Sequence, residues 1–393
     1  MIGGFIETAQ DGMFSPYPAM AFLDIGEPVT LAMVIVAVAL LVVIILLLPY
    51  FTLLRSIADF SYPNAMFKAV GLPFLSRRNL EALSETTSLT ELVSRLGEMD
   101  IRIASTQRMG LDDVESSLEA ENIRSLRNTL ASVPEGAKPF YRAYLTRMDA
   151  LQLKKALRGL RSGTVPVLHP AFYVDAETVR RLSEASSPRD ILDIMDGTPF
   201  APALSSAMQE MPDSPVRWEM ALDNAVMGWI HDSIFQVDQE LQMPLREFHG
   251  RMADCSNIIL LARWKASLEI DDVSSLLVPG GRELPGWALE RLAESPDLQS
   301  LISELETTSY GRSLKSLSAG KTLASDVENA MEEQLLDLVT EISSRNNLLV
   351  GPSIMFTYGK EKEIANIRAV SRNVEEGGSF RDVEEFLVMG AST

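Results

Sequence analysis

The stretch of this sequence that comes closest to a phosphate-binding loop is Ala319-Gly320-Lys321-Thr322. A loop of that type needs another glycine five residues before Gly320, and it follows a β-strand. Lys315 occupies the glycine position instead, and the preceding residues repeat with a helical period. The pattern therefore favours an ordinary turn between helices, and we predict no nucleotide or other cofactor site.

The three histidines also fail to form a recognisable site. His169, His231 and His249 are never three or four residues apart, so no two of them share one face of a helix as metal ligands. No Gly-x-Ser-x-Gly nucleophile motif is present. The acidic pairs Asp112-Asp113 and Asp271-Asp272 stand where helices are expected to begin, and stabilisation of the helix dipole explains them. We predict no catalytic and no metal-binding residues.

An acid, an amide and an arginine recur three times with one internal spacing. Each copy reads acid, two residues, amide, then Leu or Ile, with an arginine five residues after that aliphatic residue. The acids are Asp149, Asp254 and Glu363, the amides are Gln152, Asn257 and Asn366, and the arginines are Arg158, Arg263 and Arg372. The acids lie 105 and 109 residues apart. Such self-similarity is typical of a repeat architecture.

The repeat extends upstream of these motifs. About thirty residues before each acid, a glutamate is followed three residues later by a large apolar side chain: Glu115 with Leu118, Glu219 with Leu222, and Glu328 with Met331. Two copies add an aromatic residue and a leucine, Phe200 with Leu204 and Tyr310 with Leu314, whereas the first copy has Ile101 and Ser105 there. We therefore divide the sequence from residue 60 onward into three units, 60–165, 166–275 and 276–393.

The repeated polar residues favour a structural role over a catalytic one. Catalytic groups converge on one site, whereas these groups recur once per unit. On a helix the acid and the amide share a face, so charge-assisted hydrogen bonds could tie that helix to its neighbours within the unit. Replacing Arg158, Arg263 or Arg372 by Ala should then lower stability by a few kcal/mol, because a buried partner is left unpaired.

The elements that carry these residues are predicted to be helices. Apolar residues recur at steps of three and four over 80–96, 179–195 and 289–305, and each stretch is long enough for two short helices. Ser88, Ser187 and Asp297 fall at the breaks, where short polar side chains cap a following helix. Longer amphipathic runs cover 217–241 and 326–348, and no segment alternates with the period of a strand.

Composition restricts the class of protein. The chain of 393 residues carries 54 acidic and 35 basic residues, a net charge of −19 that disfavours binding to nucleic acid. Cys255 is the single cysteine, so an internal disulfide is excluded, and its amphipathic surroundings indicate a buried, inert thiol.

A membrane span precedes the repeats. The residues from Val29 to Leu48 carry no charge, and twenty residues at about 1.5 Å each cover roughly 30 Å of hydrocarbon. The first 54 residues contain no Lys or Arg, and basic residues begin at Arg55. The positive-inside rule then places segment 1–28 outside the cell, a transmembrane helix at 29–54 and the rest in the cytoplasm. A buried core helix is the alternative, and the uniform apolar run disfavours it.

Several segments resemble one known family. Gly351-Pro352-Ser353-Ile354, the run from Lys360 to Arg368 and then Arg372 are similar to the C-terminal signature of the C subunits of archaeal A-type ATP synthases, the counterparts of the d subunits of vacuolar ATPases. The segments that also match are Tyr62-Pro63-Asn64-Ala65, the run from Arg217 to Asp223, and Arg345-Asn346. The resemblance covers about 62–373, which is nearly all of the part that follows the span.

The resemblance implies an all-α fold of three helical units around a pseudo-three-fold axis, shaped as a funnel. It also implies a non-catalytic central-stalk subunit that couples the proteolipid rotor ring in the membrane to the central axle during proton or sodium transport, with no small-molecule substrate. Many members lack an N-terminal span, so the resemblance leaves open whether this one lies inside the ring or in lipid.

Two other functions remain possible from the sequence. A membrane-tethered helical scaffold that recruits cytoplasmic partners also predicts three helical units, but it stacks them in an open row. A membrane-anchored hydrolase or transferase needs a converging set of polar catalytic groups, and the sequence offers none.

Overall fold

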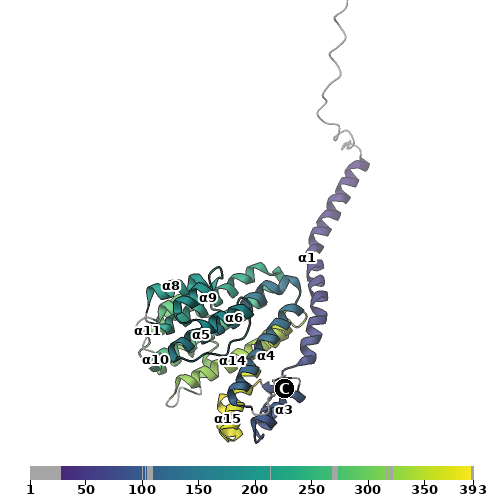
Figure 1. The fold of residues 1–393 in the computed structure, drawn as a ribbon. Helices are drawn as coiled ribbons and strands as arrows, with labels where there is room; N and C mark the ends of the chain where they lie inside the picture. Colours follow the sequence, from purple (N-terminus) through teal and green to yellow (C-terminus); the bar gives the residue numbers. More distant parts are fainter. Residues whose placement is uncertain are drawn as a thin grey trace, which may run out of the picture. The chain divides into compact units, whose positions relative to one another are not determined.

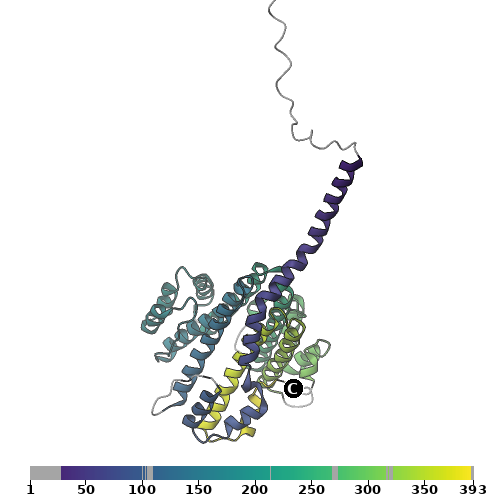
Figure 2. The ribbon, with the colours of Figure 1, turned by 90° about the vertical axis from the view of Figure 1, so that its right-hand side faces the viewer.

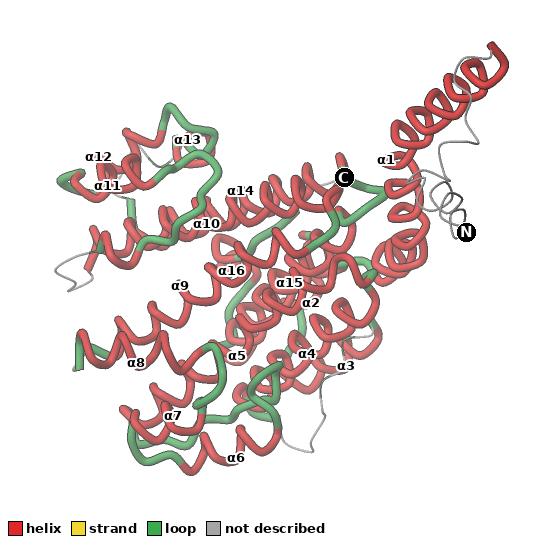
Figure 3. The backbone as a smooth tube through the Cα atoms, turned by 90° about the horizontal axis from the view of Figure 1, so that it is seen from above, coloured by secondary structure: helices red, strands yellow, loops and turns green. Residues whose placement is uncertain are grey.

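The computed structural model describes residues 28–99, 101, 103, 109–212, 214–267, 273–315, 317 and 322–390, and within these the regular elements are all helices (Figures 1 and 3). The all-α prediction is therefore confirmed for the described part of the chain. Three predicted features lie outside the described residues: segment 1–27, the pair Asp271-Asp272 and the stretch Ala319-Gly320-Lys321.

The chain divides into two compact units, residues 1–56 and 57–393, which we describe separately. The helix α1, Pro28–Val70, supplies the described part of the first unit. It is the one described helix that is long and apolar enough to cross a membrane, and its most apolar window is 0% buried. Most of the side chains from Val29 to Leu48 are exposed.

In the second unit, the predicted pairs of short helices form with the predicted breaks. The pairs are α2 (Arg77–Ser84) with α3 (Leu89–Glu98), α6 (Ala176–Glu184) with α7 (Pro188–Ile194), and α11 (Gly286–Glu294) with α12 (Leu298–Leu305). The caps are also as predicted: Ser88, Ser187 and Asp297 accept hydrogen bonds from the amides of Glu91, Asp190 and Ser300 at 3.3, 3.3 and 2.8 Å. A cap of this kind contributes about 1 kcal/mol to its helix.

Six long helices carry the repeated polar residues of this unit. The helices that carry the repeated glutamates are α4 (Leu111–Ser132), α9 (Pro215–Ser233) and α14 (Ala324–Arg345). After a short turn, each leads into the helix that carries the acid, the amide and the arginine: α5 (Lys138–Ser162), α10 (Gln239–Ser267) and α15 (Gly351–Glu375). The predicted run 217–241 is not one helix, because it breaks at the 3-10 turn η3, Ile234–Gln236.

The remaining elements are short. They are α8 (Phe200–Glu210), α13 (Gly311–Leu314) and α16 (Phe380–Val383), with 3-10 turns η1 (Pro73–Leu75), η2 (Glu135–Ala137), η4 (Ser274–Leu276) and η5 (Glu384–Phe386). The end of α5 is marked by Gly163 at φ +70°, a left-handed conformation that glycine adopts without steric cost.

The long helices pack against the short pair that follows them in the repeat order. Helix α5 contacts α6, α7 and α9, helix α10 contacts α11, α12 and α14, and helix α15 contacts α2, α3 and α4. The views in Figures 2 and 3 show this last group, in which α15 lies beside α2, α3 and α4. One of the two hydrophobic cores accordingly joins both ends of the repeat region, from Phe74 to Leu118 and from Ile364 to Leu387.

The last turns of α1 belong to the second unit and are held there by a buried face. Phe60 and Phe67 are 1% and 3% exposed, and Phe67 stacks on Phe356 at 5.0 Å between ring centroids. Between them, Asn64 donates hydrogen bonds to the carbonyls of Asn347 at 3.4 Å and Leu349 at 2.8 Å. The side chain of Asn64 thereby fixes α1 to the turn between α14 and α15.

Candidate functional site

The three repeated acids are buried and bind the backbone of a loop. Oδ1 of Asp149 accepts the amides of Phe172, Tyr173 and Val174 at 2.9, 2.9 and 2.8 Å. Asp254 accepts the amides of Arg282, Glu283 and Leu284 at 2.9, 2.7 and 3.2 Å. All three acids have 0% exposure, so these bonds replace water around a carboxylate that the fold has desolvated.

The third acid uses a different set of donors. Glu363 accepts the amide of Phe74 at 2.9 Å and the ammonium of Lys360 at 2.6 Å. Lys360 and Glu363 side chains are 8% and 0% exposed, so this is a buried ion pair on one face of α15. An ion pair of this kind stabilises the fold only while both partners are present.

The three amides bind the same loops as the acids. Asn257 forms two hydrogen bonds with Val278, one to its carbonyl and one from its amide, both at 2.8 Å. Asn366 makes the same pair with Val388 at 2.8 and 2.9 Å, and it also donates to the carbonyl of Phe74 at 3.0 Å. Gln152 accepts the amide of His169 at 2.8 Å and donates to Glu119 at 3.0 Å.

In every copy the loop that is bound precedes the next pair of short helices. For α5 and α10 that loop is one continuous segment, 168–174 or 278–284. For α15 it is assembled from two distant segments, Phe74 before α2 and Val388 near the C-terminus, and these are joined by a hydrogen bond from Gly390 to the carbonyl of Leu75 at 3.2 Å. The last copy therefore binds the start of the first.

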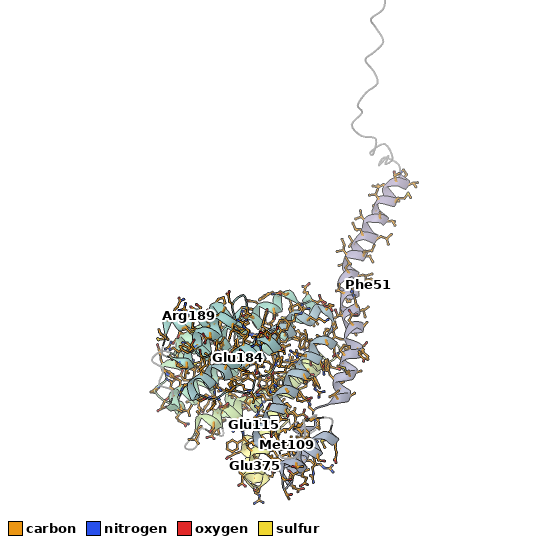
Figure 4. All side chains as sticks on the ribbon, viewed as in Figure 1. Phe51, Met109, Glu115, Glu184, Arg189 and Glu375 are labelled. Carbon is orange, nitrogen blue, oxygen red and sulfur yellow. The ribbon has the colours of Figure 1, made fainter. Side chains whose placement is uncertain are left out.

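The arginines follow the same order. Nε of Arg158 donates to Glu219 at 2.9 Å, Nη2 of Arg263 to Glu328 at 2.6 Å, and Nε of Arg372 to Glu115 at 2.6 Å. Each arginine thus pairs with the glutamate of the next copy, and the third pairs with the first. Figure 4 shows Glu115 in the same part of the second unit as Glu375, which ends helix α15.

Two expectations about the arginines were wrong. The pairs do not lie within one unit, because each long helix packs on the glutamate helix that follows it. Their partners are also not buried: the glutamate side chains are 18%, 33% and 27% exposed, and the arginine side chains are 63%, 54% and 55% exposed. Pairs as exposed as these contribute about 0.2–1 kcal/mol each, so the buried acids and amides are the stronger part of the motif.

Corresponding positions of the first and third long helices also meet. Arg147 and Glu361 stand two residues before Asp149 and Glu363, and Nη1 of Arg147 donates to Glu361 at 2.8 Å. Nearer the start of the same two helices, the hydroxyl of Tyr141 on α5 donates to the hydroxyl of Ser353 on α15 at 2.6 Å, and both side chains are buried. Phe248 of α10 lies against both helices, with ring centroids 6.1 Å from Tyr144 and from Tyr358.

Comparison with known proteins decides the family. Residues 63–381 match the model of the family described as ATP synthase (C/AC39) subunit. The chain belongs to this family. It is 27% identical to the C subunit of the A-type ATP synthase of Methanothermobacter thermautotrophicus, over 83% of this chain and 87% of the relative. It is 24% identical to the proteins of that name from Thermococcus onnurineus and Pyrococcus abyssi, each over 84% of this chain and 90% of the relative.

The family match confirms the resemblance that the sequence motifs indicated. The matched region begins at Pro63, after the apolar part of α1, and it ends at Arg381, so the acids, the amides and the arginines all lie inside it. These relatives are named as subunits of ATP synthases, and membership therefore places this chain in a family of ATP synthase subunits.

Burial shifts the pKa values of the acids in this family member. Desolvation raises the pKa of Asp149 to about 6, although three backbone amides oppose the shift. Desolvation also raises the pKa of Asp254 and of Glu363, and their hydrogen bonds and the Lys360 ammonium oppose it. Of the three acids, Asp149 is the one with a buried carboxylate oxygen, Oδ2, that has no hydrogen-bond partner among the described residues.

Some contacts could not be read from the spacing of residues. The rings of His231 and His249 lie 5.3 Å apart between centroids, on α9 and α10, although no helical spacing joins them. His249 is bonded through Nε2 to the carbonyl of Met227 at 3.0 Å, and burial lowers its pKa to about 4. Among the described residues no group of three or more His, Cys, Asp or Glu could hold a metal ion.

A second contact that was missed joins Asp254 to an aromatic residue of the repeat. The hydroxyl of Tyr310 donates to Oδ2 of Asp254 at 2.7 Å. The sequence showed that Tyr310 and Phe200 hold the same place in two copies, but 56 residues separate Tyr310 from its partner. Sequence spacing alone gave no sign that this aromatic position and the repeated acid meet.

Proposed function

We propose that this chain is the non-catalytic central-stalk subunit of an A/V-type rotary ATP synthase or ATPase. In this role it couples the membrane rotor ring to the central axle during proton or sodium transport. Membership of the family and the names of its relatives support the proposal. The described structure adds an all-helical body whose buried polar groups bind other parts of the same chain.

The cyclic pairing of arginines with glutamates is the observation that carries the proposal. The pairs run from the first copy to the second, from the second to the third and from the third to the first. This order favours three units, 60–165, 166–275 and 276–393, closed around a pseudo-three-fold axis as a funnel. We call this closed arrangement of the three units the collar. Its packed helices make it stiff, and a subunit that transmits torque must be stiff.

We further propose that the apolar part of α1 spans the membrane. Exposure of its apolar side chains to water is unfavourable, and the length of the apolar run matches the thickness of the hydrocarbon layer. Basic residues begin at Arg55, which supports an N-terminus outside the cell and a main body on the cytoplasmic side.

The proposed partners are the proteolipid subunits of the rotor ring and the axle subunits. Nucleic acid is not a proposed partner, because the net charge of −19 repels a phosphate backbone. A small-molecule substrate and a cofactor are not proposed either, because the repeated polar side chains are bonded to backbone and to each other.

The first experiment tests the role in the complex. Membranes that carry the complex without this chain should hydrolyse ATP without ATP-driven ion uptake, and the full-length chain should restore ion uptake when it is added back. Purification of the tagged chain should recover the proteolipid and axle subunits in fixed ratio. Unchanged ion uptake without the chain would refute the proposal and would favour the membrane-tethered scaffold.

The second experiment tests closure of the collar. Cysteines replace Glu115 and Arg372 in the full-length chain, and a short bismaleimide is added; Cys255 is buried and should not compete. We expect an intramolecular cross-link between the first and third copies. The matched control, Glu115→Cys with Arg263→Cys, joins two positions that do not pair with each other and should give little product. Equal yields in both variants would contradict a specific closing contact.

A further inference from the structure

The three copies of the repeat bind their loops in different ways, and the first copy has an incomplete set of donors. In the second copy, both oxygens of Asp254 are bonded: Oδ1 accepts the amide of Leu284, and Oδ2 accepts the amides of Arg282 and Glu283 and the hydroxyl of Tyr310. In the third copy, Lys360 adds an ammonium to Glu363. In the first copy, three amides share Oδ1 of Asp149, and Oδ2 is buried without a partner in the described part of the chain.

The three amides all bond one oxygen in the first copy but divide between both oxygens in the second, and the first copy also lacks the tyrosine hydroxyl. Phe200 stands where the second copy has Tyr310. Thr198 and Thr308, two residues earlier, both donate their hydroxyl to the carbonyl three residues before them at 2.7 Å, so the local structure is the same. The Phe200 ring is fully buried, and its centroid is 6.1 Å from that of Tyr173, whose amide binds Asp149. A phenylalanine has no hydroxyl to offer.

The first copy also lacks an arginine that supports these contacts in the second copy. In the second copy, Arg251 stands three residues before Asp254 and bonds both the Tyr310 hydroxyl, at 3.2 Å, and Glu283 of the bound loop. The first copy has Thr146 at that position, and its hydroxyl donates to the carbonyl of Ala143 at 2.6 Å instead. A hollow of about 320 Å³ lies against Thr146, Phe172 and Tyr173. The hollow therefore borders Thr146 and Tyr173, which stand where the second copy has Arg251 and Glu283, and Arg142 also lines it.

We propose that the contact between Asp149 and the loop 168–174 is a pH-sensitive joint of the second unit, which loosens as the pH rises. When Asp149 is ionised, one buried oxygen carries negative charge with no donor, and this destabilises the closed joint. When Asp149 is protonated, the charge is gone and Oδ1 still accepts the loop amides. Opening the joint exposes the carboxylate to water, so ionisation favours the open form.

The direction of this pH dependence follows from the pKa shift of the Asp149 carboxyl group. The pKa of Asp149 is about 6 in the folded chain, above the value of about 3.9 for an exposed aspartate. When folding raises the pKa of a carboxyl group, the group stabilises the fold fully at a pH below its unfolded pKa. This stabilisation is lost as the pH rises through the folded pKa. From these two values, the ratio of open to closed joint should rise about tenfold between pH 5 and pH 8.

One of the charged and titratable groups around Asp149 acts in the opposite direction, and the variant Asp149→Asn separates its effect from that of Asp149. These groups are Arg127 on α4, Arg142 on α5, Asp175 at the start of α6, and the cluster of Glu119, Lys155 and His169 beside Gln152. Burial lowers the pKa of His169, and a histidine with a lowered pKa destabilises the fold as the pH falls, which is a dependence of opposite sign.

Hydrogen exchange of the full-length chain in detergent micelles tests the joint. Protection of the amides of residues 172–174, corrected for intrinsic exchange rates, should fall about tenfold from pH 5 to pH 8. The matched loop at residues 282–284 should change less, because both oxygens of Asp254 have donors there. Equal pH dependence of the two loops would overturn the proposal.

Exchange of the aromatic residues between the copies sharpens the test. Phe200→Tyr should reduce the pH dependence of the first loop, and Tyr310→Phe should increase that of the second. If the added hydroxyl disrupts packing, Asp149→Asn serves instead: this side chain does not titrate, so the pH dependence at 172–174 should disappear. Persistence of the full pH dependence in Asp149→Asn would show that another group is responsible and would refute the joint.

Discussion

Replacement of Asn257 by Ala should destabilise the chain far more than loss of the nearby arginine. The Asn257 side chain is fully buried, and it satisfies both the amide and the carbonyl of Val278 at 2.8 Å. Truncation leaves those two backbone groups buried without partners, at roughly 1–3 kcal/mol each. We therefore expect the free energy of unfolding to fall by about 2–5 kcal/mol.

The matched control lies on the same helix. Arg263→Ala removes a pair in which Arg263 is 54% exposed and Glu328 is 33% exposed, and the expected loss is about 0.2–1 kcal/mol. Urea denaturation of the full-length chain in detergent micelles, followed by far-ultraviolet circular dichroism, measures both variants. If Asn257→Ala costs no more than Arg263→Ala, the buried amide is not the stronger part of the motif and the reasoning fails.

A third variant at this position adds a pH test. Asn257→Asp keeps an acceptor for the amide of Val278, but it places a second oxygen where the donor faced the carbonyl. Ionisation is then disfavoured in the folded chain, so the folded pKa of the new carboxyl group lies above its unfolded value. The variant should be closer to the parent chain at pH 5 than at pH 8, because stability from a raised pKa is lost as the pH rises. Equal loss at both values would show that charge repulsion is not the cause.

Three further outcomes are expected. Deletion of Met1–Leu54 should leave a soluble, helical protein by circular dichroism and size-exclusion chromatography, because residues 57–393 contain the core; a truncated chain that does not fold would show that the span contributes to it. Cys255 should react slowly with a thiol reagent at pH 8 and completely in urea, because burial raises its pKa; rapid reaction in the native chain would contradict the burial. Lys360→Met should cost about 3–5 kcal/mol, because it leaves the buried Glu363 without its cation, and adding Glu363→Gln should recover part of this loss in the same urea assay; no recovery would argue against the unpaired charge.

The sequence predicted local structure well where a residue acts on its own neighbours. Ser88, Ser187 and Asp297 were recognisable as caps because a cap binds an amide three residues away. The break at Ile234–Gln236 was not recognisable, because apolar side chains continue through Ile234, Phe235 and Val237 without a Gly or Pro to mark the turn.

The sequence could name the residues of the repeat but not their partners. It showed that Arg372 and Glu115 are repeated positions. The sequence does not distinguish an arginine that pairs with the glutamate of its own unit from one that pairs with the glutamate of the next unit. The packing of α15 on α4 decides between these possibilities, and that contact joins residues 257 positions apart. The same holds for Asn366, whose loop is assembled from Phe74 and Val388 at opposite ends of the repeat region.

The offset between copies supports a closed arrangement over an open row. Each long helix binds groups of the next copy through its acid, its amide and its arginine. Contacts within one copy are added by Gln152 with Glu119, by Glu363 with Lys360 and by Asn366 with Val388. In an open row of three copies, the first glutamate helix and the last long helix would each lack these partners. Here Glu115 pairs with Arg372, and Phe74 bonds Glu363 and Asn366. An open solenoid of this sequence would have to break those contacts. It would also expose to water the hydrophobic core that residues 74–118 and 364–387 share, at a large cost in free energy.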